Sequence, residues 1–260
     1  MLRTLLTISM LIPLLAVAEE VNVGNFVRAE SDHMLRTNLA TFGIGVGEVV
    51  HIREATTPEV QPVIRMNQDT LYSAVVLDLT KPVTVTLPEL GGRYQSMHLV
   101  NQDHYMFFEA KPGTYELTEE SVGTRFALVT IRTFVDPNDP EDVKQAHAAQ
   151  DAIEISGGGK GPLETPDWNQ AQLAVARKAL SDLATLGFDA SHAFGREEDI
   201  RPVDYLVGAA AGSCSGAAVA GARAQGLEAM LREAKVIRRL EGPGSQRPQG
   251  SEGRHLDTLD

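Results

Sequence analysis

The residues best suited to chemistry in this chain lie between Val63 and Phe108. Asp69 stands between Asn67 and Thr70, whose side chains can orient a carboxylate by hydrogen bonds, so we predict Asp69 as a catalytic acid or base. An aspartate in such a sequence can instead satisfy backbone amides in a turn, and that alternative stays open.

Arginines and tyrosines surround this aspartate in the sequence. Arg65 and Arg93 could clamp an anionic substrate, because a guanidinium binds carboxylate or phosphate in a forked geometry. They could equally pair with Asp69 or Asp103 inside the sheet, since a buried arginine usually has a carboxylate partner. The predicted ligand-binding residues are Arg65, Asn67, Tyr72, Arg93, Tyr94, Asn101 and His104.

Two histidines, His98 and His104, come closest to a metal site or a catalytic cluster. Two histidines alone fall short of a zinc ligand set, so we predict no metal and no cofactor. Ser96 and His98 share a strand face, but such neighbours are roughly 6–7 Å apart along the strand, too far for a serine–histidine pair.

Alternating β-branched and aromatic residues predict the elements that must position these side chains. Short turns separate the runs, which favours an antiparallel sandwich or jelly roll over alternating βα units. The predicted strands are Leu71 to Leu79, Val83 to Leu87, Arg93 to Val100, Tyr105 to Glu109, Thr114 to Leu117 and Phe126 to Val135.

Helices are predicted on both sides of this β-rich region. Apolar spacing predicts the first from Asn22 to Phe42. Asp139-Pro140 is a good helix start, and that helix is expected to run to about Ile155. A third is predicted from Trp168 to Leu186, and its apolar residues on one face are Trp168, Ala171, Val175, Leu183 and Leu186. The fold class is therefore α+β.

Composition and the N-terminal residues restrict the partners and the location. A net charge of −12 disfavours nucleic acid and anionic membranes. Residues 1–18 have a basic start, a short apolar run and an Ala-Val-Ala ending typical of a signal peptide. We therefore expect a periplasmic or secreted protein without stable membrane insertion after cleavage, which binds an unknown small molecule.

Three motifs resemble the domain-of-unknown-function 1254 family of exported bacterial proteins. They are Arg65-x-Asn67-x-Asp69-Thr70-Leu71-Tyr72-Ser73, Gly91-Gly92-Arg93-Tyr94, and the stretch from Asp136 to Asp151. The likeness extends from about Val21 to Gly212. It implies a β-rich domain, then helices, then a second β domain of the 1214 type.

The sequence after Gly212 departs from that family pattern. An Ala/Gly/Arg-rich tail without strand pattern follows, and we hypothesise a shifted reading frame that removes the second β domain. The expected organisation is a signal peptide (1–18), a β-rich domain with an N-terminal helix (19–136), a helical segment (137–212) and a partly disordered tail (213–260).

Three functions remain open from the sequence. The first is a small-molecule site, for a ligand that could be anionic, on the β domain. The second is a hydrolase or lyase that uses Asp69 as acid or base, with Arg93 holding an anion. The third is a structural protein of the cell envelope, in which the polar cluster only stabilises the sheet.

Overall fold

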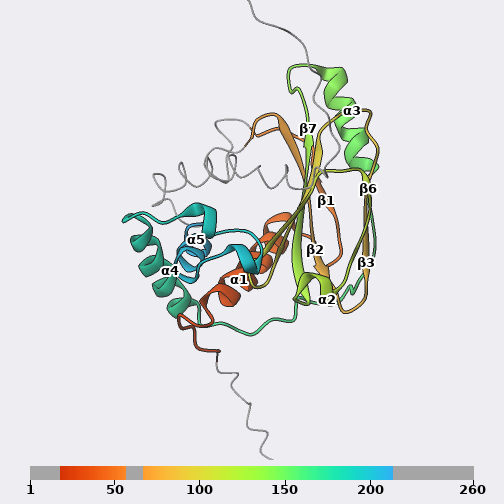
Figure 1. Ribbon diagram of the computed structural model, residues 1–260. Helices are drawn as coiled ribbons and strands as arrows, with labels where there is room; N and C mark the ends of the chain where they lie inside the picture. The colour runs from red at the N-terminus through yellow and green to blue at the C-terminus, as the bar shows by residue number, and fades with distance from the viewer. Residues whose placement is uncertain (1–17, 57–66, 213–260) are drawn as a thin grey trace, which may run out of the picture.

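The computed structural model describes residues 18–56 and 67–212, and these form three layers (Figure 1). A five-stranded antiparallel sheet lies in the middle, with a small sheet on one side and helices on the other. The central sheet has the order β1-β2-β7-β4-β5. Its strands are β1 (Val50–Ile52), β2 (Thr70–Asp78), β4 (Gln95–Asn101), β5 (Met106–Glu109) and β7 (Phe126–Phe134).

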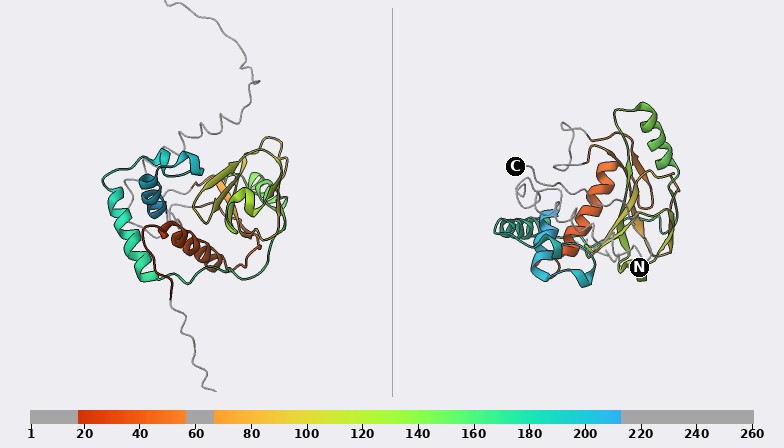
Figure 2. Two further views of the ribbon diagram at one scale, coloured as in Figure 1. Left: turned by 60° about the horizontal axis from the view of Figure 1, so that its bottom comes forward. Right: turned by 45° about the horizontal axis from the view of Figure 1, so that its top comes forward.

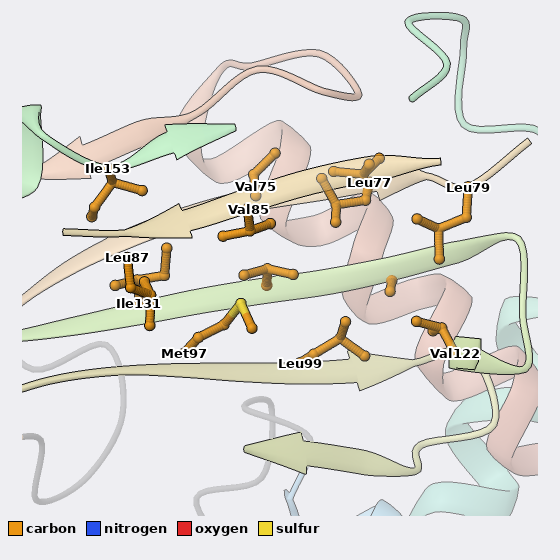
Figure 3. Packing of buried hydrophobic residues seen from close by; sticks show 13 residues of the cluster. Val75, Leu77, Leu79, Val85, Leu87, Met97, Leu99, Val122, Ile131 and Ile153 are labelled. Atoms are coloured by element: carbon orange, nitrogen blue, oxygen red, sulfur yellow. The ribbon is translucent and has the colours of Figure 1, made fainter. Parts of the chain in front are cut away.

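The second sheet has three strands in the order β6-β3-β8 and packs on one face of the first. Figure 3 shows the apolar side chains that fill the space between the two sheets. Val75, Val85, Leu99 and Val129 are among them, and each is at most 1% exposed. The strands of the small sheet are β3 (Val83–Leu87), β6 (Gly113–Leu117) and β8 (Glu154–Gly157).

Residues of the central sheet alternate between its two faces. In β7, Ala127, Val129 and Ile131 point into the sandwich core, so the residues between them face the helical layer. Phe126 packs there against Leu35 of α1 (Phe26–Phe42). Figure 1 shows α1 beside the sheet, below the level at which β7 ends.

Helices α1, α4 (Gln170–Ala184) and α5 (Pro202–Gly212) form the third layer, as Figure 2 shows from two further directions. Phe26, Leu173 and Ala209 bring the three helices into one apolar cluster. Two 3-10 turns, Ala190–His192 and Glu197–Asp199, lie between α4 and α5.

A buried ion pair joins the first two helices of this layer. The Arg177 guanidinium of α4 donates to both carboxylate oxygens of Glu30 in α1, at 2.6 to 3.0 Å. Because Glu30 is almost fully buried, this fork fixes α4 against α1 as well as compensating the buried charge.

Two short helices occupy the connections of the sandwich. They are α2 (Glu119–Val122) and α3 (Pro140–Asp151). The Asp139 side chain accepts the Glu141 N–H, and Pro140 occupies the first turn, so the predicted start of α3 is confirmed. Helix α3 covers the end of the sandwich, where Ala146 packs on Leu71 and Val135.

The structure confirms the predicted α+β class and antiparallel strands, with two local differences. Helix α3 ends at Asp151 and is followed by β8, so the expected helix to Ile155 is too long. Ile155 pairs with Val85 and joins the sandwich core. The segment expected to be helical, residues 137–212, thus also contributes one strand to the small sheet.

The packed face of α4 also differs from the expectation. Val175, Leu183 and Leu186 are 71%, 48% and 83% exposed, whereas Leu173 and Leu180 are buried. Both sets have helical spacing, and the charged Arg177 belongs to the buried side through its pair with Glu30. Periodicity alone therefore could not choose between the two stripes.

Some predictions fall outside the described residues: nearly all of the signal peptide, Arg65, and the tail from residue 213. Among the helices of the described chain, none combines the length and the apolar character needed to span a bilayer.

Candidate functional site

Five of the predicted residues lie near one end of the central sheet. Asp69 immediately precedes β2, and its carbonyl oxygen accepts the N–H of Val135 at 2.9 Å. Tyr94 precedes β4, and its carbonyl oxygen accepts the N–H of Phe134 at 2.9 Å. Asp69 and Tyr94 therefore flank the end of β7 from opposite sides, with Tyr72 and Arg93 beside them in the sequence.

Asp69 and Asn67 are exposed at this end of the sheet. The Thr70 hydroxyl donates to the Asp69 carboxylate at 3.2 Å, which is the orienting contact that the sequence suggested. An exposed carboxylate held by one hydroxyl could accept a proton from a bound molecule.

Arg93 forms an ion pair with a carboxylate, but that carboxylate is neither Asp69 nor Asp103, the two anticipated from the sequence. Its guanidinium forms a fork with Asp142 of α3 at 2.5 and 3.1 Å and also donates to the Phe134 carbonyl at 2.7 Å. The Arg93 hydrogen bond, together with the N–H of Asp136, lowers the pKa of Asp142. Arg93 thus ties α3 to the ends of β4 and β7.

Asn101 and His104 lie at the opposite end of β4 and do not join the first group. The Asn101 side chain holds a turn: its oxygen accepts the N–H groups of Asp103 and Tyr105, and its amide donates to the Val122 carbonyl at 2.7 Å. His104 is buried in this turn with a left-handed backbone (φ 62°), 3.5 Å from the Ser31 hydroxyl of α1.

The residue that sequence reasoning missed is Arg132, in β7, the middle strand of the central sheet. Strand pairing places Arg132 directly opposite Tyr72 on one side and Ser96 on the other. The next row holds Thr130 opposite His98 on the same face. We call Tyr72, Ser96, His98, Thr130 and Arg132 the Arg132 patch.

The polar groups of this patch are incompletely satisfied. The Arg132 Nε and the Ser96 hydroxyl are buried and have no hydrogen-bond partner. The Arg132 guanidinium lies 5.9 Å from the centre of the Tyr72 ring, a cation–π contact that does not neutralise its charge. Arg93, Arg125 and Arg177 each form an ion pair. Within residues 18–56 and 67–212, no ion pair includes Arg132.

His98 is a neutral neighbour of this cation. Burial and then the positive charges of Arg132 and His104 lower the pKa of His98 to about 4. At neutral pH its imidazole is therefore uncharged and can donate or accept a hydrogen bond. The patch as a whole carries one positive charge with neutral hydrogen-bonding groups around it.

A second polar cluster lies on the opposite face, beneath α3. The His51 Nδ1 is 2.8 Å from the Ser73 hydroxyl, and the Gln150 amide donates to that hydroxyl at 3.2 Å. Ser73 is 1% exposed and Gln150 is fully buried, so this serine is closed to a substrate. The cluster joins β1, β2 and α3 and is structural.

The small cavity of the described chain, about 50 Å³, is also away from the Arg132 patch. Asp78, Lys160 and the glycines at 157–159 line it. The Asp78 carboxylate accepts two hydrogen bonds from Arg125, at 3.0 and 3.1 Å, so its charge is balanced there. No group of three or more metal-binding side chains occurs in the part of the chain that the structure describes.

A signal for Arg132 was present in the sequence. The run Ala127, Val129 and Ile131 fixes one apolar face of a central strand, so Arg132 must lie on the other face. What the sequence could not supply was the pairing of β7 with β2 and β4, because partners in a sheet depend on long-range topology.

Comparisons with known proteins identify the domain and its fold. Residues 46–157 match the model of the family described as "Protein of unknown function (DUF1254)". The crystal structure of the VPA0106 protein from Vibrio parahaemolyticus is similar, with a TM-score of 0.52 and 16% identity. That alignment covers 74% of this chain and only 65% of the other chain. No curated protein matches the chain.

Proposed function

Because residues 46–157 place this chain in the DUF1254 family, whose name states no activity, we propose its function from the site itself. The chain binds a small anionic molecule at the Arg132 patch. The observation that carries this proposal is a guanidinium in a central strand whose Nε is buried without a partner.

The physical argument is the cost of a buried donor without an acceptor. Arg132 is partly exposed, but its Nε is buried, and buried polar groups in native proteins nearly always have partners. A carboxylate or phosphate oxygen at Arg132 would supply the missing acceptor and the missing negative charge together. The Ser96 hydroxyl, on the strand next to Arg132, also lacks a hydrogen-bond partner, but Ser96 is 1% exposed, so the ligand contact is assigned to Arg132 alone.

The residues predicted from sequence contribute unequally to this proposal. Tyr72 belongs to the Arg132 patch, and Tyr94 lies at its border through the pairing with Phe134. Arg93 is already neutralised by Asp142 and is assigned a structural role. Export to the periplasm or the medium is part of the proposal and is supported by the pattern of residues 1–18.

The test is a thermal-shift screen of the full chain with small carboxylates and phosphate at constant ionic strength. A ligand present at 100 times its Kd stabilises the folded state by about 2.7 kcal/mol, so we expect Tm to rise by roughly 5–10 °C. Arg132→Gln should abolish that rise.

Arg93→Gln is the matched control. It removes an equal charge from the same end of the sheet but leaves Arg132 in place, so the ligand-induced rise should persist. If no anion raises Tm, or if Arg132→Gln leaves the rise intact, the patch is not an anion site and the structural role considered from the sequence takes its place.

A further inference from the structure

Two exposed aromatic residues border the Arg132 patch. Phe134 lies two residues beyond Arg132 in β7, and therefore on the same face. Tyr94 is held opposite Phe134 by the hydrogen bond from the Phe134 N–H to the Tyr94 carbonyl. Their exposed fractions are 43% and 51%, high values for large aromatic side chains beside the middle strand of a sheet.

We infer that the ligand of the Arg132 patch is an aromatic monocarboxylate, with its carboxylate on Arg132 and its ring against Phe134 and Tyr94. This inference rests on the proposed function and specifies its ligand class. Aromatic rings favour offset or edge-to-face contacts with one another, and such contacts add to the gain from burying their surface.

The spacing of the strand supports this class. Residues at positions i and i+2 of a strand are roughly 6.5–7 Å apart. The distance from the Arg132 position to the Phe134 position thus suits a molecule in which one or two bonds separate a carboxylate from a ring. An aliphatic acid as short as acetate would leave the two aromatic side chains in water.

The charge of the site favours a monoanion. Arg132 is the cation of the patch, while Tyr72, Ser96 and Thr130 carry neutral hydroxyls. His98 adds no positive charge at neutral pH, because its pKa is lowered to about 4. The exposed Asp69 at the same end of the sheet, and a chain charge of −12, would repel a second negative charge.

The experiment compares phenylacetate, acetate and inorganic phosphate by calorimetric titration of the full chain. Phenylacetate is expected to bind at least tenfold more tightly than the other two. Phe134→Ser should weaken phenylacetate binding about tenfold and leave acetate binding unchanged. Leu186→Ser, which alters an 83% exposed side chain just after α4, should change neither.

Each outcome separates this inference from the proposed function. Equal affinities for acetate and phenylacetate, or a preference for phosphate, overturn the aromatic class while Arg132→Gln still weakens binding. If Arg132→Gln affects none of the three probes, the proposed function and the inference both fail. Circular dichroism of each variant verifies that it is folded, which is expected because Phe134 and Leu186 are exposed.

Discussion

Arg93 and Arg132 lie near the same end of the central sheet, but they differ in their hydrogen-bond and ion-pair partners. The Arg93 guanidinium donates hydrogen bonds to both carboxylate oxygens of Asp142 in α3 and to the backbone carbonyl of Phe134. Arg132 faces the helical layer, with a tyrosine ring and a partnerless serine hydroxyl as neighbours. The Arg93 guanidinium is paired within the fold, while the Nε of Arg132 has no hydrogen-bond partner in the described chain.

The difference shows why residue type alone does not identify a site. Both arginines could bind an anion, but of the two only Arg93 was predicted as a ligand-binding residue from the sequence. In the fold, Arg93 forms an ion pair with Asp142, so its guanidinium is not available to a ligand. A functional arginine is better recognised by hydrogen-bonding capacity that the protein leaves unused.

Acid should produce the largest effect on stability, and it acts on His98 in the middle of β4 and on His104 in the turn that follows it. Burial lowers the pKa of His98 and that of His104 to about 4, whereas unfolded histidine titrates near 6.5. The unfolded chain therefore binds protons first as the pH falls. Each histidine should cost about 1.4 kcal/mol of stability per pH unit between roughly pH 6.5 and 4, with the full contribution present above pH 6.5.

Urea unfolding at several pH values between 7.5 and 4.5 measures this slope. The His98→Gln variant isolates the contribution of one imidazole, and its profile should be flatter than that of the unchanged chain. Parallel profiles would mean that His98 is not kept neutral beside Arg132.

Ile131→Ala should give the next largest loss of stability. It tests whether Ile131 lies on the face of β7 that packs in the sandwich core. Ile131 is 1% exposed among the sandwich residues, and its truncation leaves a cavity. We expect a loss of about 2–5 kcal/mol in the free energy of unfolding, measured by urea denaturation. A loss below about 1 kcal/mol would show that the two sheets are not packed on this residue.

Arg93→Gln tests the arginine that is already paired within the fold. The substitution breaks the fork to Asp142 and the bond to the Phe134 carbonyl, so Tm should fall by roughly 2–4 °C. Lowering the pH through the depressed pKa of Asp142 should reduce the difference between the variant and the unchanged chain, because the pair is lost as the carboxylate protonates. A pH-independent difference would assign the loss to packing rather than to the ion pair.

Arg132→Gln should have the smallest effect on stability, and its direction is the informative part. Since the charge has no counter-ion among the described residues, removing it should leave the free energy of unfolding unchanged or raise it by up to about 1 kcal/mol. Urea denaturation without ligand measures it. A clear destabilisation would show that this guanidinium has a stabilising partner in the folded chain, as Arg93 does.

The sequence predicted much of the fold for identifiable reasons. Strand β3 alternates apolar and polar residues, β2, β4 and β7 contain short runs rich in apolar residues, and Asp139-Pro140 marks the start of α3, so local patterns sufficed. Strand β8 was missed because Glu154–Gly157 is short and depends on pairing with β3.

The candidate site was only partly predictable, because its members meet through strand pairing. Tyr72 and Ser96 are 24 positions apart in the chain and flank Arg132 only after β7 inserts between their strands. Asn101 and His104 were grouped with them by nearness in sequence. Tyr94 precedes β4, whereas Asn101 is the last residue of β4 and His104 lies beyond it, so the strand keeps them at opposite ends of the sheet.

The most direct test of the account is the NMR signal of the Arg132 Nε–H during a titration with phenylacetate at constant ionic strength. The account predicts a saturable shift of this resonance, while the Nε–H of Arg93 stays in place because that side chain is bound to Asp142. A resonance of Arg132 that does not move, or that moves no more than that of Arg93, would contradict the proposal that this guanidinium is the ligand's anchor.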